Sequence, residues 1–308
     1  MPNTQQTATE RKRAASVVGR ALSVVGLVAL LLAMYIFAIR PSQLHWGATA
    51  EEIARPMPGD DLVAHPTFLA TRAITIRGRP EDIWPWLIQI GYDRAGFYGY
   101  DAIENLGAQR GIHSADRIIP ELQHPAVGNR VYMSRIAYLI FGAIVPSQYL
   151  IWTGDQVPSD GAFTWALYPL DASHTRLVSR IRIRYHWTDR SIILALFTEF
   201  ADHVAVPRVL LGVKDRVEGR VPQSLGTQIA QIAVWLLVFF ELLASIFFVF
   251  RWRRWWLGWI LALASGSALL FSLYAHFHPA VGGALGVMLG LAICVCRADS
   301  LREQRTGQ

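Results

Sequence analysis

The longest uniform features of the chain are apolar runs that lack charged side chains. Residues 21–39, 255–275 and 280–296 contain no Asp, Glu, Lys or Arg, and residues 229–250 contain only Glu241. Each run approaches the ~20 apolar residues that a helix needs to cross ~30 Å of hydrocarbon. The pattern therefore predicts four transmembrane helices, of which the last is the shortest.

Between the first two of these helices lies a long polar stretch whose second half alternates like a β-sheet. In residues 174–187 the odd positions are mostly apolar, whereas the even positions carry arginines. Strict alternation is typical of a strand with one buried and one wet face. Turn residues and β-branched or aromatic content predict further strands at residues 71–76, 128–133, 147–154 and 162–170.

The arginine face of residues 174–187 has two interpretations. Arg176, Arg180, Arg182 and Arg184 could bind lipid headgroups, or they could form a solvated face with acidic partners on the neighbouring strand. The solvated face is the commoner arrangement for such a stripe, and the sequence favours it.

Two segments of the polar stretch have helical signatures. Residues 80–88 open with Pro80, which suits a first helical position, and continue with an apolar run that predicts a buried helix kinked at Pro85. Residues 191–218 carry apolar side chains at helical spacing and predict a long helix that Pro207 interrupts.

The order of these elements indicates the fold class. A Pro- and Gly-rich lead-in at residues 40–70 is expected to be irregular, and it precedes a strand, short helices, several antiparallel strands and the long helix. An antiparallel sheet wrapped around that final helix buries the apolar faces most economically. We therefore predict an α+β domain together with the four transmembrane helices.

The distribution of charge predicts a topology. The net charge is +6, and it resides in the flanks because residues 40–220 contain equal numbers of basic and acidic side chains. Basic clusters stand at residues 11–13 and 251–254 and in the tail, all on one side of a four-span protein. The positive-inside rule makes that side cytoplasmic. We expect a cytoplasmic N-terminus (1–20), a cytoplasmic tail (297–308) and an extracytoplasmic domain in a bacterial-type plasma membrane.

Several other classes are disfavoured by the sequence. A cleaved signal peptide is less consistent with residues 21–39 than an anchor, because the run is long and no A-x-A-like site precedes Arg40. Since Cys294 and Cys296 both lie in the last apolar run, we expect no disulfide and no thiolate metal site in the polar domain. No metal, cofactor or nucleic-acid partner is predicted.

Residues 81–107 combine aromatic rings with charged side chains in one short stretch. Arg94 is expected to neutralise Asp101 or Glu104 in a partly buried space, because an unpaired buried carboxylate is costly. Asp101 and Glu104, three residues apart, can share one helical face. A structural network is the favoured interpretation, ahead of a ligand pocket and of a catalytic site. The chain shows no nucleophile elbow, zinc-binding H-E-x-x-H or phosphate loop.

Five motifs of residues 43–220 resemble the START-like, or SRPBCC, superfamily that includes polyketide cyclases and lipid-transfer domains. They are "WGAT" at 46–49, "PGD" at 58–60, "TRAITI" at 71–76, "WPWLIQIG" at 84–91 and "RAGFYGYDAIEN" at 94–105. The more specific likeness is to an actinobacterial-type subgroup, here membrane-anchored. The resemblance implies a helix-grip fold with a cavity between sheet and helix.

The resemblance also turns the aromatic stretch into a candidate ligand site. The short helices after the first strand would close one end of the cavity, with Phe97 among the aromatic residues of its wall. The candidate ligand-binding residues are Trp84, Trp86, Gln89, Arg94, Tyr98, Tyr100, Asp101, Glu104 and Asn105.

The apolar runs contain a few polar and small residues of interest. Glu241 lies near the middle of its run, and Ser265 and Ser267 lie at similar depth in the next. An intramembrane acid is a functional candidate, although a protonated Glu241 bonded to a serine is the favoured interpretation. Glycines in residues 258–266 and 282–290 have the spacing of a close helix–helix contact.

Together these observations favour a membrane-tethered START-like domain that binds a hydrophobic small molecule or lipid. The alternatives are a cyclase- or aromatase-like enzyme, with Arg94, Asp101 and Glu104 as polar actors, and a structural membrane protein with a filled core. The expected partners are membrane lipids and a hydrophobic small molecule. An enzyme is the less favoured class, and the sequence does not indicate a ligand, a reaction or an oligomeric state.

Overall fold

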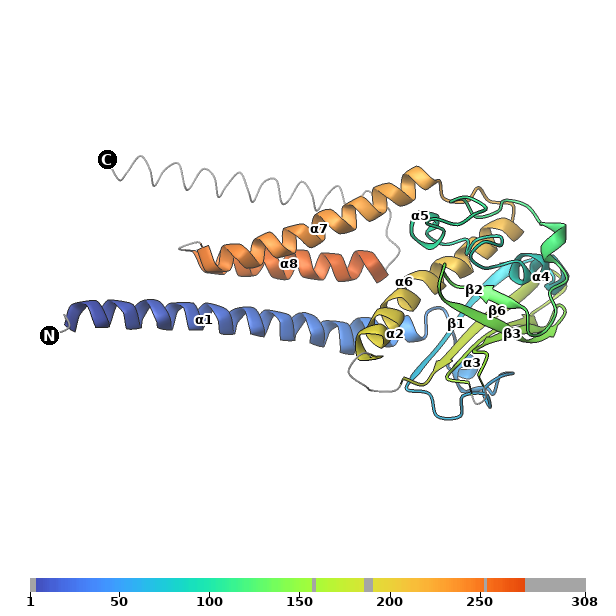
Figure 1. Ribbon diagram of the computed structural model, residues 1–308, viewed down its shortest axis with the longest axis horizontal. Helices are drawn as coiled ribbons and strands as arrows, with labels where there is room; N and C mark the ends of the chain where they lie inside the picture. Colours follow the sequence, from blue (N-terminus) through green and yellow to red (C-terminus); the bar gives the residue numbers. More distant parts are fainter. Residues whose placement is uncertain (1–3, 157–158, 186–190, 252–253, 275–308) are drawn as a thin grey trace. The chain divides into compact units, whose positions relative to one another are not determined.

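A computed structural model describes residues 4–156, 159–185, 191–251 and 254–274 of the chain (Figure 1). The chain divides into two compact units. One contains Met1–Arg40 and Ile229–Gln308, and the other contains Pro41–Gln228. The apolar run predicted as a fourth span, at 280–296, and the tail after it lie outside the described residues.

Three helical stretches in the described residues are long and apolar enough to cross a membrane. They cover Glu10–Leu44, Leu225–Arg251 and Trp255–Leu273, and they correspond to the first three predicted spans. Their elements are α1 (Thr4–Met34), the π-helix η1 (Tyr35–Ile39), α2 (Arg40–Leu44), α7 (Leu225–Arg251) and α8 (Trp255–Tyr274).

Within the unit that contains Met1–Arg40 and Ile229–Gln308, two glycines allow α8 to pack closely on its neighbouring helices. A Cβ on Gly258 would lie 2.7 Å from the Val249 nitrogen of α7, and a Cβ on Gly266 would lie 2.6 Å from the Leu31 side chain of α1. The small-residue stripe of α8 therefore packs against α7 and α1. Its predicted partner stripe at 282–290 lies outside the described residues.

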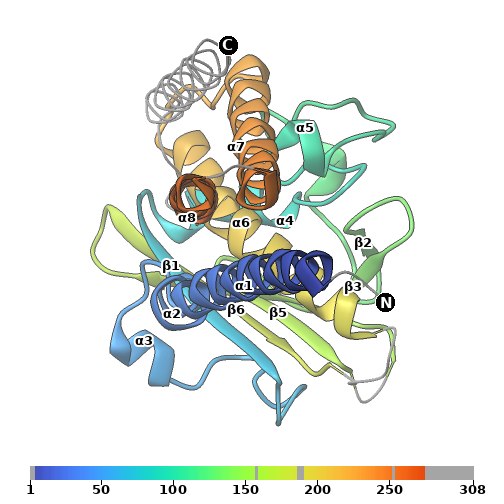
Figure 2. The same cartoon turned by 90° about the vertical axis from the view of Figure 1, so that its left-hand side faces the viewer.

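The unit Pro41–Gln228 is built on a six-stranded antiparallel sheet with the order β1-β6-β5-β4-β3-β2 (Figure 2). Each segment predicted as a strand overlaps one of the observed strands. The sequence analysis missed β3, because "YLIFGAIV" is apolar at nearly every position and shows no alternation. The strands are β1 (Phe68–Arg77), β2 (Arg130–Tyr132), β3 (Tyr138–Val145), β4 (Tyr149–Thr153), β5 (Gly161–Pro169) and β6 (His174–Ile183).

The long helix α6 (Ser191–Val217) lies along one face of this sheet and contacts β1 and α4 (Pro80–Ile88) (Figure 2). Sheet and helix together make the predicted helix-grip arrangement. The predicted break at Pro207 is wrong, since α6 runs through it. Proline removes the bond to the carbonyl four residues earlier. Burial of Val206, Val209 and Leu210 in the core compensates for that loss.

Two shorter helices and one 3-10 turn connect β1 to β2. Pro80 opens α4 as predicted, and the helix continues through Pro85 to Ile88. The other two elements are α5 (Asp101–Glu104) and η2 (Pro120–Leu122).

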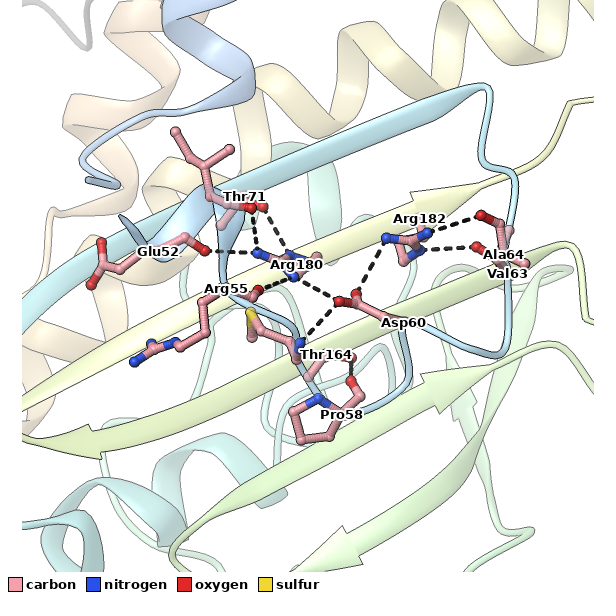
Figure 3. Close-up of polar contacts among 12 residues, drawn as sticks. Glu52, Arg55, Pro58, Asp60, Val63, Ala64, Thr71, Thr164, Arg180 and Arg182 are labelled. Carbon is pink, nitrogen blue, oxygen red and sulfur yellow. Dashed lines mark hydrogen bonds and ion pairs between the residues drawn. The ribbon is translucent and has the colours of Figure 1, made fainter. Parts of the chain in front are cut away.

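The opposite face of the sheet is covered by the lead-in segment, which includes α3 (Ala50–Ala54). Arg180 of β6 is only 4% exposed and donates to the carbonyls of residues 52, 53 and 55 and to the Asp60 carboxylate at 2.8 Å (Figure 3). Arg182 donates to the Val63 carbonyl at 2.9 Å. This network of residues 52–64 with β6 is named the lead-in clamp.

The predicted solvated arginine face is therefore wrong for most of β6. Arg176 is paired with Glu52 of the lead-in at 2.7 Å. Only Arg184 has the expected partner from the neighbouring strand, Asp160, just before β5. The main partners lie over a hundred positions earlier in the chain, which strand alternation does not reveal.

Candidate functional site

A cavity of about 240 Å³ lies between the inner face of the sheet and α6. It is partly open to the surface and is lined, within the unit Pro41–Gln228, by four strands or strand ends, by α6, by α5 and by the segment before α5. Its lining residues are Phe97, Glu104, Met133, Trp152, Phe163, Trp165, Ile183, Thr198, Ala201, Asp202, Ala205, Val206 and Val209.

Sheet geometry explains why two tryptophans share the wall. Trp152 of β4 stands opposite Phe163 of β5, and Trp165 follows Phe163 by two positions on the same face. The two indole rings make an edge-to-face contact with centroids 5.5 Å apart. They are 2% and 4% exposed, so they form a rigid aromatic surface against the cavity.

Four buried polar atoms of the lining residues have no hydrogen-bond partner in the described part of the chain. Buried polar groups are normally satisfied, so a concentration of exceptions around one cavity marks a candidate site. The atoms are Trp152 Nε1, Trp165 Nε1, Glu104 Oε1 and Asp202 Oδ1.

Glu104 is held at the cavity by the backbone of its own turn. The nitrogen of Tyr100 donates to Glu104 Oε2 at 2.9 Å, and Oε1 has no partner among the described residues. Burial, with the nearby Asp101 charge as a smaller cause, raises the pKa of Glu104 to about 8. The Glu104 carboxyl group is therefore protonated at neutral pH and can donate a hydrogen bond.

Asp202 is held by a buried arginine of the sheet. Arg72, 1% exposed, donates from Nη2 to Asp202 Oδ2 at 2.5 Å and to His203 Nδ1 at 2.8 Å. Its Nε donates to the carbonyl of Gln43 at 2.7 Å. One guanidinium therefore joins β1, α2 and α6, and it pairs with the second of the two acids, Glu104 and Asp202, among the described lining residues.

Of the predicted ligand-binding residues, only Glu104 lines the cavity, together with Phe97 of the predicted wall. Gln89, which is fully buried, donates to the Tyr98 hydroxyl at 2.8 Å and accepts from the Ile119 nitrogen at 2.9 Å. Tyr98 in turn donates to the carbonyl of Trp86 at 3.1 Å. Through these bonds, Gln89 and Tyr98 connect the end of α4 to the turn before α5 and to the loop at Ile119.

Close approach of α6 fixes the position of Tyr98. A Cβ on Gly212 would lie 2.0 Å from the Tyr98 carbonyl oxygen, so only glycine allows this contact. The Arg216 guanidinium lies 4.1 Å from the centre of the Tyr98 ring. Because Tyr98 has a positive φ of 65°, the turn before α5 is strained and is held in place by this packing.

The predicted pairing of Arg94 with Asp101 or Glu104 is wrong. Arg94 donates to the backbone carbonyls of Ile88 at 2.9 Å and Ile90 at 3.2 Å. It thereby caps the end of α4, whose last carbonyls have no partner within the helix. An arginine close to acidic residues in the sequence favours an ion pair, but a guanidinium can equally well donate to backbone carbonyl oxygens, as Arg94 does here.

Asp101 is instead satisfied by neutral donors. It accepts from Ser114 Oγ at 2.5 Å, from the Ser114 nitrogen at 3.0 Å and from Asn105 Nδ2 at 3.1 Å. Asp101, Asn105 and Ser114 are all buried. They tie α5 to the following loop, as the structural interpretation of the stretch expected.

The two remaining predicted residues have supporting positions. Tyr100 is 2% exposed and supplies the backbone donor to Glu104, whereas Trp84 is partly buried against the core. Neither lines the cavity.

Among the described residues of the apolar helices, no hydrogen bond joins Glu241 to a serine, so the favoured glutamate–serine bond is not formed there. Ser265 donates to the carbonyl of Leu261 in its own helix at 2.7 Å. Glu241 and Ser267 are partly buried.

Sequence reasoning missed Arg72, Asp202 and the two cavity tryptophans. The sequence contains a signal for Arg72. It lies an even number of positions from the buried Phe68, Ala70 and Ile76 of β1, so it is a charged residue on the apolar face of the strand. Such a residue requires a buried partner. Nothing in the local sequence identified that partner as Asp202.

No family model and no curated protein matches the chain. Among solved structures, it is similar to a conserved protein of unknown function from Enterococcus faecalis, with 16% identity and a TM-score of 0.31 over 52% of this chain and 79% of the other. It is also similar to a polyketide cyclase-like protein from Corynebacterium glutamicum, with 14% identity and a TM-score of 0.32 over 49% and 91%. The Aha1 protein from Colwellia psychrerythraea aligns with 15% identity and a TM-score of 0.29 over 49% and 97%.

The similarity concerns the fold of the domain. Identities of 14–16% and TM-scores near 0.3 support no statement about a ligand or a reaction. The function proposed below is based on the cavity of this chain.

Proposed function

We propose that residues 41–228 form a membrane-tethered START-like domain that binds a small hydrophobic molecule between the sheet and α6. The observation that carries this proposal is the apolar cavity of about 240 Å³ whose wall includes four unsatisfied polar atoms. An apolar pocket with a few convergent polar groups is the usual form of a small-molecule site. The cavity also argues against the alternative of a filled, purely structural core.

The size of the cavity limits the ligand. Pockets for drug-sized ligands are typically about 300–1,000 Å³, and this one lies just below that range. A two-chain phospholipid is much larger. The ligand is therefore a compact molecule or a single short chain, buried against Trp152, Trp165 and the α6 alanines.

The chain on either side of the domain supports the proposal of tethering. The helical stretch Glu10–Leu44 precedes it and Leu225–Arg251 follows it, and both are apolar enough to cross a membrane. The arginine clusters that flank these stretches favour an extracytoplasmic domain, and membrane lipids are its expected neighbours.

Native mass spectrometry of the full chain in detergent tests the ligand proposal. Wild type should release a co-purifying small molecule, and Ala205→Phe, which places a ring in the cavity, should reduce its occupancy at least about tenfold. Ala172→Phe in the exposed β5–β6 turn is the matched control and should retain the molecule. Equal occupancy in all three proteins would place the ligand elsewhere and refute the proposal.

A second candidate function rests on Glu104 alone. An acid with a pKa of about 8 at a cavity wall is suited to general acid–base chemistry near neutral pH. Arg94 and Asp101, the other proposed polar actors, are satisfied by carbonyls and by Ser114 instead. If the domain is an enzyme, Glu104→Gln should bind the co-purified molecule but no longer convert it. Unchanged conversion would eliminate this candidate.

A further inference from the structure

We infer that the ligand of this cavity is electrically neutral and carries a hydroxyl group, or a comparable group that both donates and accepts a hydrogen bond. This inference rests on the proposed function and specifies the class of ligand. It excludes fatty acids, phosphate esters and organic cations as preferred occupants.

An anionic head group would find no cationic side chain among the described lining residues. None of the lining residues in the described part of the chain is Lys, Arg or His, whereas two are acids. Arg72 does not compensate, because it is not a lining residue and its Nε and Nη2 groups are engaged by the Gln43 carbonyl, Asp202 and His203. A buried carboxylate or phosphate would keep its full charge there without a cationic partner, and neutral indole and hydroxyl donors do not offset the loss of its hydration.

A cationic ligand is disfavoured as well. Asp202 already shares its charge with Arg72 in a buried pair, and both side chains are at most 5% exposed. Burial keeps the Glu104 carboxyl group protonated at neutral pH. A cationic head would therefore find no free negative charge and would lose its hydration on entry.

The unsatisfied atoms favour a group that both donates and accepts. Residues lining the cavity carry donors without acceptors, at Trp152 Nε1 and Trp165 Nε1, and an acceptor without a donor, at Asp202 Oδ1, and these atoms lie buried beneath the cavity surface. Indole nitrogen can only donate and an ionised carboxylate oxygen can only accept. One hydroxyl group can bond to both kinds of atom, since it is donor and acceptor at once.

A series of four probes on one naphthalene frame separates these possibilities. They are 2-naphthalenemethanol, 2-methylnaphthalene, 2-naphthoate and 2-naphthylmethylamine, which differ only in the head group. Binding to the full chain in lipid nanodiscs is measured by equilibrium dialysis at neutral pH. Binding to Ala205→Phe in the same nanodiscs is subtracted, because it reports partition into lipid.

The alcohol should bind at least about tenfold more tightly than the hydrocarbon, because only the alcohol satisfies the orphaned donors and acceptor. The carboxylate and the ammonium should bind more weakly than the alcohol by a still larger factor. Equal or tighter binding of either charged probe, or equal binding of alcohol and hydrocarbon, would overturn the inference while leaving the proposed function intact. Absence of protein-specific binding for all four probes would contradict the proposed function as well.

Variants of the tryptophans connect the preference to the proposed atoms. Trp152→Phe and Trp165→Phe remove the indole N–H and keep an aromatic ring. Each should lower the affinity for the alcohol about three- to tenfold and change that for the hydrocarbon by less than about twofold. Trp84→Phe, outside the cavity, is the matched control and should change neither. Parallel losses for alcohol and hydrocarbon would show that the ring packing, and not the N–H group, determines binding. If the variants fail to fold, the four-probe comparison on wild type still decides the inference.

Discussion

At the scale of single residues, the domain depends on a small number of buried polar groups around α6. Arg72 joins Asp202, His203 and the Gln43 carbonyl in a site almost inaccessible to water. A buried ion pair contributes modestly in itself, but its unpaired halves are costly. This asymmetry makes the pair testable by a double-mutant cycle.

Arg72→Met should destabilise the domain by about 3–5 kcal/mol, because it leaves the Asp202 carboxylate buried without its partner. The double variant Arg72→Met/Asp202→Leu should cost less than the two single losses together. Urea unfolding of the full chain, followed by tryptophan fluorescence, measures each loss. Arg79→Met is the control, since its pair with Asp82 is exposed and should contribute less than about 1 kcal/mol. Additive losses at Arg72 and Asp202 would show that the pair is not coupled.

Glu104 should give the stability of the domain a characteristic pH dependence. Its pKa is about 8 in the folded state against 4.5 for an unperturbed glutamate, so between these values the folded state binds more protons. The free energy of unfolding therefore falls as pH rises from about 5 to 8, by up to ~1.4 kcal/mol per pH unit from this group. Glu104→Gln should remove that contribution, as measured by urea unfolding at a series of pH values.

Glu121→Gln, an exposed glutamate of η2, is the matched control and should leave the pH profile unchanged. A profile of Glu104→Gln that follows wild type throughout would mean that the Glu104 carboxyl group is ionised in the folded protein.

At the scale of elements, alternation predicted β6 and helical spacing predicted α6, because each pattern records which face is buried. The same patterns did not reveal what covers the other face of β6. In the lead-in clamp, Asp60 and several backbone carbonyls accept hydrogen bonds from Arg180 and Arg182 (Figure 3). These acceptors lie more than a hundred positions before the arginines in the sequence. Proline- and glycine-rich composition predicts an irregular backbone, and it contains no information about where such a segment docks.

Arg180→Lys should loosen this clamp. Lysine keeps the charge and cannot reproduce the fork that reaches the carbonyls of residues 52, 53 and 55 and Asp60 together. We expect a loss of about 2–4 kcal/mol in unfolding free energy and faster proteolytic cleavage within residues 55–65. Arg184→Lys, at a half-exposed pair with Asp160, should change either quantity little. Identical cleavage rates in both variants would show that the clamp is held by other contacts.

At the scale of the whole molecule, the sequence predicted the helix-grip domain and its first three apolar helices. It did not predict which residues of the aromatic stretch would line the cavity. Most of residues 84–105 turned out to hold α4, α5 and the neighbouring loops together, and Glu104 is the predicted site residue that lines the cavity. Site residues from β4, β5 and α6 meet only in the folded sheet, and no local motif connects them.

The proposed topology can be tested by reporter fusions. A periplasm-active reporter after residue 160 should be active, because the domain is expected outside. The same reporter after residue 308 should be inactive, since the arginine clusters favour cytoplasmic termini. Equal activity at both positions would contradict the four-span arrangement.

Protection of a single thiol tests most directly whether this cavity binds hydrophobic molecules. Ala205→Cys is introduced into the full chain with the two native cysteines, Cys294 and Cys296, replaced by alanine. Ala205 lines the cavity, so the rate of its modification by N-ethylmaleimide should fall as 2-methylnaphthalene or 2-naphthalenemethanol is added, in proportion to occupancy. A cysteine at Ala172 in the exposed β5–β6 turn should react at a constant rate. Constant rates at both positions under saturating probe, or the same decrease at both, would contradict the account.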